Sequence, residues 1–179
     1  MEDLSLHILD IAENSLRAGS TCVEIEIDVD TAADRITITV RDNGKGMTEA
    51  EIKQVMDPFY SSKTTHRIGL GIPLLHESAS QANGSVRIES EPGKGTTVTA
   101  WFELSHIDRR PFGKITETII TLIAGNPDVN FRYTSTIDGT KFTFATEEIK
   151  KSLREVPINS IEVLNFIRRA LIEHEISLP

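Results

Sequence analysis

Two short runs in which apolar and polar residues alternate set the architecture of this chain. Residues 23–27 have the sequence VEIEI and residues 36–40 have the sequence ITITV, with a polar turn between them. Because successive side chains of a strand point to opposite faces, this pattern predicts a hairpin with one apolar face. A hairpin alone is only marginally stable in water, so a second layer has to cover that face.

Helices that can supply this layer are predicted on both sides of the hairpin. Residues 3–18 carry apolar side chains at helical spacing, and Gly19 follows as a C-terminal cap. Later segments repeat the two patterns, with helices expected at 48–56 and 72–83 and strands at 86–89 and 97–104. We predict that residues 1–105 form a two-layer α/β sandwich, a mixed sheet covered on one face by helices. The strand at 97–104 is expected to complete this sheet.

The pattern changes beyond residue 105. The sequence predicts a short helix at 114–124, a hairpin of 129–136 and 140–144 across Asp138-Gly139, and helices at 147–154 and 160–173. A chain of 179 residues has room for one domain and a small appendage. We interpret residues 106–179 as a small α+β module that docks a partner or dimerises.

The charge balance argues against binding to nucleic acid. The chain has 27 Asp and Glu against 19 Lys and Arg, a net charge of −8, and its basic clusters are short. No apolar run approaches the roughly 20 residues that cross a bilayer. The first residues are acidic where a secretory signal would be basic. We therefore expect a cytoplasmic protein that binds neither nucleic acid nor membrane.

One face of the first predicted helix is polar. It carries His7, Asp10, Asn14 and Arg17, at spacings of three, four and three residues. A solvated stripe is the ordinary interpretation, and His7 is expected to face solvent or a ligand. The chemical interpretation is that a carboxylate handles a proton, an amide oxygen holds a divalent cation and a guanidinium meets phosphate.

Two glycine-bearing segments are suited to hold a ligand. Residues 42–47 (DNGKGM) directly follow a strand, so glycine backbone can approach a flat ligand while Asp42 accepts a hydrogen bond. By itself this segment is also compatible with a hairpin turn, or even with a poor calcium loop. Gly69 and Gly71 precede a predicted helix, whose N-terminal amides favour bound phosphate.

In this order, the segments resemble the GHKL superfamily of histidine kinases, MutL, GyrB and Hsp90. The similar segments are 10–19 (DIAENSLRAG, N box), 42–47 (first glycine box), 58–63 (PFYSSK, F box), 68–72 (IGLGI, second glycine box) and 89–96 (ESEPGKGT, the closing segment of nitrogen-sensor-type histidine kinases). The resemblance implies the Bergerat fold of a histidine-kinase-like ATP-binding domain, with ATP between the helix layer and a lid. It does not extend to residues 106–179.

The resemblance also implies roles for individual residues. Asn14 is expected to bind the Mg²⁺ that bridges the phosphates, and Arg17 to contact phosphate. Asp42 is expected to accept a hydrogen bond from the adenine amino group, with Thr96 supporting it through water. The other implied positions are glycines that shape the adenine pocket, Gly44 and Gly46, and lid residues, Lys63, Gly69, Leu70 and Gly71.

Two departures from the family pattern bear on mechanism. The water-activating ATPases have Glu four residues before the N-box Asn, whereas this chain has Asp10, a shorter carboxylate that is expected to be a weaker base. The second departure is that we expect no phospho-acceptor hairpin ahead of the N box, and we expect neither His76 nor His174 to replace its histidine.

Three functions remain open from the sequence. The first is a kinase that transfers the γ-phosphoryl group to a separate protein, as the anti-sigma-factor kinases of this superfamily do. The second is a slow ATPase that switches a partner interface, and the third is a non-catalytic ATP-binding module. Each implies ATP, Mg²⁺ and a protein substrate or regulatory partner, and each is compatible with a homodimer.

Overall fold

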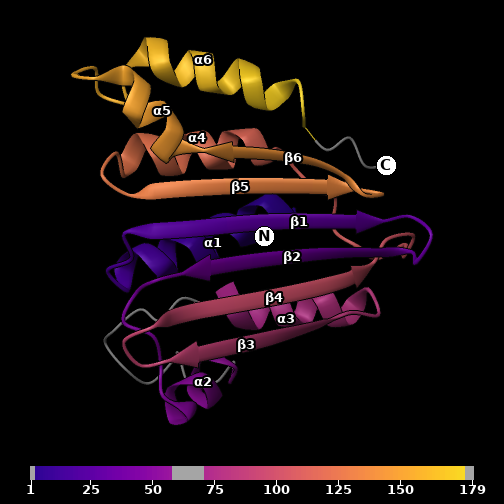
Figure 1. The fold of residues 1–179 in the computed structure, drawn as a ribbon. Coiled ribbons are helices and arrows are strands. Elements are labelled where there is room, and N and C mark those ends of the chain that lie inside the picture. The colour runs from indigo at the N-terminus through magenta and orange to yellow at the C-terminus, as the bar shows by residue number, and fades with distance from the viewer. Residues whose placement is uncertain (1–2, 58–70, 176–179) are drawn as a thin grey trace.

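The computed structural model describes residues 3–57 and 71–175, which build one six-stranded sheet (Figure 1). The strand order is β3-β4-β2-β1-β5-β6. The strands are β1 (Cys22–Asp30), β2 (Arg35–Asp42), β3 (Ser85–Glu91), β4 (Gly95–Glu103), β5 (Asn130–Ile137) and β6 (Thr140–Ala145). Neighbouring strands are antiparallel except β1 and β5, which are parallel. The sheet is therefore mixed, as predicted.

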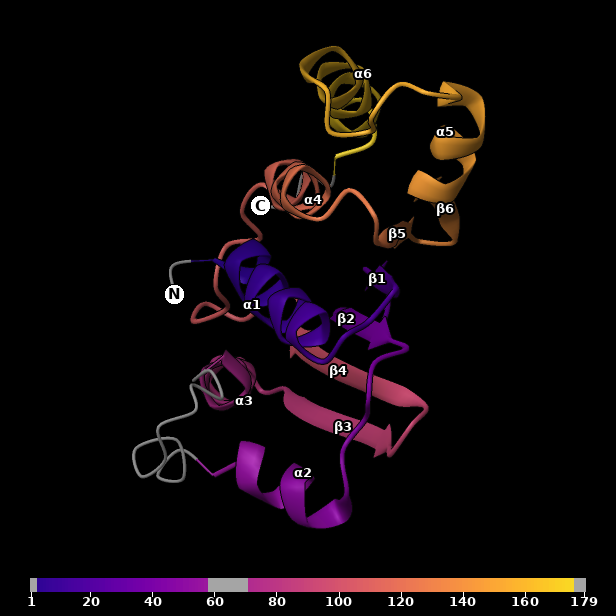
Figure 2. The same cartoon turned by 90° about the vertical axis from the view of Figure 1, so that its left-hand side faces the viewer.

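The helices pack mainly on one face of this sheet. They are α1 (Leu4–Arg17), α2 (Glu49–Val55), α3 (Gly71–Gln81), α4 (Ile115–Gly125), α5 (Thr146–Leu153) and α6 (Ile161–Ile172). Figure 2 shows α1, α3 and α4 side by side against the sheet, with α6 outside α4. This arrangement confirms the predicted sandwich and the Bergerat type of fold.

The alternating runs direct their apolar residues to the helix layer. In β1, Val23, Ile25 and Ile27 are buried while Glu26 and Asp28 are exposed. Ile8 and Ile11 of α1 are buried in the same apolar cluster. Full burial of an Ile or Val side chain contributes about 1.5–3 kcal/mol, so this layer contact is a main source of stability.

The sheet does not end at β4, so the expectation that this strand completes it is wrong. β5 pairs in parallel with β1, placing Tyr133 beside Ile25, and α4 packs against α1. Local patterns predicted the later hairpin correctly but carried no information about its partner. Without β5, the outer edge of β1 would present unpaired N–H and C=O groups. Both parts of the chain therefore share one sheet and one apolar cluster.

Two predicted local signals occur as expected. Thr48 caps α2: its side chain accepts from the Glu51 amide, and the Glu51 side chain accepts from the Thr48 amide. Asp138 and Gly139 both have positive φ and join β5 to β6. Among the described helices, none is long and apolar enough to cross a membrane.

Candidate nucleotide site

A cavity of about 260 Å³ lies where α1 faces the loop that follows β2. Five residues predicted from the sequence line it: Asn14, Arg17, Asp42, Gly46 and Thr96. They come from α1, the end of β2, the following loop and the start of β4. Of the other predicted positions, Lys63, Gly69 and Leu70 lie outside the described residues. Asp10, Gly44 and Gly71 are described but do not line the cavity.

Asp42 is the buried acceptor of this cavity. Ser15 Oγ donates to its Oδ2 at 2.7 Å, and the Gly44 amide donates to its Oδ1 at 2.8 Å. These bonds fix the carboxylate and tie α1 to the end of β2. A carboxylate offers about four lone-pair sites, so Asp42 can accept one more hydrogen bond from a ligand.

Thr96 lies directly opposite Asp42 in the pairing of β2 with β4. Its Oγ1 is 2.8 Å from Ser90 Oγ, which also accepts from the Met47 amide at 2.8 Å. Ser90 thus connects the β3–β4 hairpin to the loop that follows β2. The positioning role of Ser90 was not predicted, although this residue belongs to the similar segment 89–96.

The glycines of the loop allow backbone to pack against backbone. A Cβ on Gly46, whose φ is +67°, would lie 2.0 Å from the Glu91 carbonyl oxygen. A Cβ on Gly44 would lie 2.9 Å from the Ala18 Cβ, beside the bond from the Lys45 amide to the Ala18 carbonyl. Gly46 also lines the cavity. Gly44 does not line it but donates its amide hydrogen to Asp42, which does.

Asn14 and Arg17 form the polar mouth of the cavity. Arg17 Nη1 donates to Asn14 Oδ1 at 2.8 Å, and its Nη2 pairs with Glu13 at 2.9 Å. The Arg17 side chain is 56% exposed, so these contacts are weak and can be exchanged for a ligand. Lys45 is a second cation on the lining, and it was not predicted.

Asp10 lies at the contact of α1 with α3. A Cβ on Gly71, the first residue of α3, would fall 1.4 Å from Asp10 Oδ2. This buried oxygen has no hydrogen-bond partner within the described part of the chain. Burial raises the pKa of Asp10, and the positive charge of Arg17 acts in the opposite direction. On this face of α1, the Asp10 carboxyl therefore packs against α3, whereas the Asn14 amide lines the cavity.

His7 does not face solvent or the cavity, so that expectation is wrong. Its side chain is 2% exposed, and its Nδ1 has no partner among the described residues. Burial lowers the pKa of His7 to about 4. Later residues pack on the beginning of α1: the Leu4 amide donates to the Pro111 carbonyl, Thr118 Oγ1 donates to the Ser5 carbonyl, and the Arg110 charge also lowers the pKa of His7.

The walls of the cavity were also missed, because they combine residues from distant segments. Its apolar lining includes Ile11, Met47, Val55, Ile72 and Val98. Glu51 and Gln54 of α2 add polar groups at the edge. Such a slot suits a flat ring with polar groups at its rim. The helical and strand patterns of the sequence indicate that apolar residues are buried, but they do not indicate which of them line a cavity.

A divalent cation would not find a ready-made protein cage here. No cluster of three or more His, Cys, Asp or Glu suited to a metal occurs among residues 3–57 and 71–175. The Asn14 amide oxygen does line the cavity. One such ligand fits Mg²⁺, which is commonly held by one or two protein oxygens together with phosphates and waters.

A one-sided mixed sheet with this cavity beside its first helix defines a GHKL-type ATP-binding module. The family described as histidine kinase-, DNA gyrase B- and HSP90-like ATPase matches residues 2–106. The chain belongs to this family, which confirms the resemblance drawn from the N box and the glycine boxes.

The curated relatives are longer than this chain, and several of them are named as kinases. The chain is 31% identical over 112 residues to a non-motile and phage-resistance protein of Caulobacter vibrioides, with 58% of this chain and 13% of that protein covered. It is 34% identical over 88 residues to sporulation kinase C of Bacillus subtilis, with 49% and 20% covered. It is 26% identical over 106 residues to the sensor histidine kinase ZraS of Escherichia coli, with 59% and 23% covered. The matched part thus amounts to less than a quarter of each relative.

The solved structures show that the likeness in fold reaches beyond residue 106. The Aquifex aeolicus MutL ATPase domain complexed with ADP has a TM-score of 0.50 and 20% identity, covering 94% of this chain and 88% of that one. The N-terminal domain of a DNA repair protein has a TM-score of 0.55 and 18% identity, covering 80% of this chain and 52% of that one. At these identities the likeness concerns the fold alone.

Proposed function

We propose that this chain binds Mg-ATP and transfers the γ-phosphoryl group to a separate protein. The observation that carries the proposal is the cavity that brings together Asn14, Arg17, Asp42 and Thr96. Membership of the ATPase family supports the nucleotide, and the kinases among the relatives support phosphoryl transfer.

The adenine end is assigned to Asp42 and the apolar walls. The carboxylate is held by Ser15 and by the Gly44 amide, so it can accept from an adenine amino group without first being ordered. Thr96, opposite on β4, can reach the same ring through water. Ile11, Ile72 and Val98 offer apolar surface to the ring.

The phosphate end is assigned to Asn14 and the two cations of the lining. Arg17 and Lys45 are placed to neutralise phosphate oxygens. Asn14 would hold Mg²⁺ through Oδ1, after Arg17 has exchanged its bond from that atom to phosphate. Bound Mg²⁺ would supply charge neutralisation, while the residues of the chain orient the nucleotide. Lys63, Gly69, Leu70 and Gly71 are proposed as lid positions.

A slow ATPase acting as a conformational switch is the second candidate. It is favoured by the raised pKa of Asp10, which suits a general base. However, Asp10 Oδ2 packs against Gly71, and Asp10 does not line the cavity. Phosphoryl transfer depends mainly on positioning and charge, so a kinase tolerates a weak base. We therefore place the kinase first.

Incubation with γ-labelled ATP, alone and with cell extract, tests this assignment. Label on a protein supports the kinase, whereas free phosphate alone supports the ATPase. Bound ATP with neither product identifies a non-catalytic module and overturns both activities. The Asp42→Asn variant is the matched control, because label that persists in it arises from a contaminating enzyme.

Residues 106–179 are proposed to carry partner specificity. They add β5 and β6 to the sheet and place α5 and α6 away from the cavity. A partner can therefore bind there without covering the nucleotide site.

A further inference from the structure

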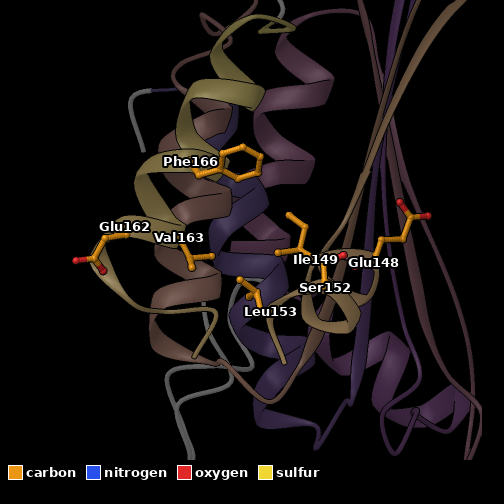
Figure 3. Close-up of a pocket in the computed structure, with 7 residues that line it drawn as sticks. All are labelled: Glu148, Ile149, Ser152, Leu153, Glu162, Val163 and Phe166. Atoms are coloured by element: carbon orange, nitrogen blue, oxygen red, sulfur yellow. Dashed lines mark hydrogen bonds between the residues drawn. The ribbon is translucent and has the colours of Figure 1, made fainter. Parts of the chain in front are cut away.

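An apolar groove of about 460 Å³ lies between α5 and α6 (Figure 3). Helix α5 contributes Glu148, Ile149, Ser152 and Leu153 to its lining, and helix α6 contributes Glu162, Val163 and Phe166. Figure 3 shows Ile149, Leu153 and Val163 between the two helices, with the Phe166 ring over the same space. Phe166 is 65% exposed, although a large aromatic side chain is costly to leave in water.

We propose that this groove binds an amphipathic helix of a partner protein that carries Lys or Arg on both sides of an apolar stripe. The inference does not depend on the reaction at the nucleotide site. It specifies the chemistry of the partner surface.

The helical form of the partner follows from the walls. All seven lining residues belong to α5 or α6, whose backbone groups are bonded along each helix. The groove therefore offers no free strand edge to an extended peptide, which would leave its own N–H and C=O groups unpaired. A helix satisfies these groups internally and presents anchors at positions i, i+3, i+4 and i+7.

The basic character follows from the charges at the rim. Glu148 and Glu162 are the charged residues of the lining, both are exposed, and neither forms an ion pair within the described part of the chain. Figure 3 shows their carboxylates on opposite sides of the apolar side chains. Of the cations on the same helices, Lys151 and Arg168 pair with Glu147 and Glu117, while Lys150 and Arg169 do not line the groove. The rim is therefore acidic on both sides.

The same charges disfavour a second copy of this chain as the occupant. A symmetric contact through the groove would bring acidic rims together, in a chain whose net charge is −8. A basic helix instead pairs with Glu148 and Glu162 while it covers Phe166.

The test uses the full chain and a fluorescein-labelled synthetic helix, LKKLLKLLKKLLKL, followed by fluorescence anisotropy without ATP. We expect saturable binding, with no binding of the acidic counterpart LEELLELLEELLEL. The double variant Glu148→Lys/Glu162→Lys should weaken binding about tenfold or more. Phe166→Ser should weaken it about fivefold or more at unchanged rim charge.

The control is Glu26→Lys/Asp28→Lys, which changes the net charge by the same amount on exposed β1 positions of the opposite sheet face. We expect this variant to bind within about threefold of the unmodified chain. Equal weakening by the two double variants would mean nonspecific attraction and would overturn the proposal. Unchanged binding by Phe166→Ser would overturn it as well.

Analytical ultracentrifugation of the unmodified chain tests the competing occupant. A dimer that Phe166→Ser dissociates would identify a second copy in the groove and overturn the proposal. A sedimentation profile that Phe166→Ser leaves unchanged, together with the expected binding series, supports the basic helix.

Discussion

The Asp10 carboxyl occupies the space that a side chain on Gly71 would fill. A Cβ there would lie 1.4 Å from Oδ2, so α1 and α3 approach this closely only because residue 71 is glycine. This contact joins the N box to the second glycine box, whose residues Gly71 and Ile72 begin α3. The close packing of α1 and α3 therefore explains why residue 71 is glycine, whether or not a nucleotide is bound.

Gly71→Ala should therefore separate α3 from α1 or displace Asp10. We expect a loss of about 1–3 kcal/mol in the free energy of unfolding, typical of overpacking, measured by urea denaturation. Gly125→Ala, at the end of α4 where a new Cβ meets nothing within 4 Å, is the matched control and should change stability little. Equal stabilities of the two variants would contradict the contact.

Asp42→Asn should nearly abolish ATP binding while the chain stays folded. The amide places a donor where an adenine amino group needs an acceptor, and unpaired buried donors cost about 1–3 kcal/mol each. Calorimetry of ATP binding measures the loss, and circular dichroism checks the fold. An affinity equal to that of the unmodified chain would remove Asp42 from the adenine site.

Asn14→Ala should keep the fold and lose the dependence of activity on Mg²⁺. Asn14 is half-buried at the cavity mouth, so its truncation leaves no void in the apolar core. The assay compares phosphate release and protein labelling across a Mg²⁺ titration. Glu13→Ala is the control on the same turn, because it also frees Arg17 from a bond but leaves Oδ1 in place. A Mg²⁺ response of Asn14→Ala that matches this control would argue against metal binding at Asn14.

The sequence predicted the elements well because their patterns are local. The alternation at 23–27 and the Thr48 capping box each depend on residues a few positions apart, and both occur as expected. The pairing of β5 with β1 was missed because it joins residues more than a hundred positions apart. His7 was misplaced for the same reason, since residues from beyond the ATP-binding motifs bond to the beginning of α1 and the Arg110 charge acts on the His7 ring.

His7 should make the chain less stable in acid. Its pKa falls from 6.5 to about 4 on folding because burial disfavours the charged ring. The unfolded chain therefore binds more protons between these values, so stability is full above pH 6.5 and falls as the pH drops towards 4. The shift corresponds to about 3 kcal/mol.

Urea denaturation of the unmodified chain and of His7→Gln between pH 7 and pH 4 measures this loss. The variant should lose less stability over that range, because Gln does not titrate. His76→Gln, which replaces an exposed histidine of α3, is the control and should keep the full dependence. The same pH dependence in all three chains would assign the acid sensitivity to other groups.

Ending the chain after Ser105 should cost the ATP-binding part much of its stability. The shortened chain retains the recognised boxes but lacks β5, which covers the outer edge of β1, and α4, which packs against α1. An open edge favours aggregation, and Leu4 and Ile8 would lose apolar cover from α4. We expect a lower unfolding midpoint and aggregation that rises with protein concentration, measured by thermal denaturation and light scattering. A chain ended after Glu175 is the control, since it keeps every described element. If the shortened chain matches this control in midpoint and solubility, residues 1–105 fold independently, and the later residues are a separable module despite sharing the sheet.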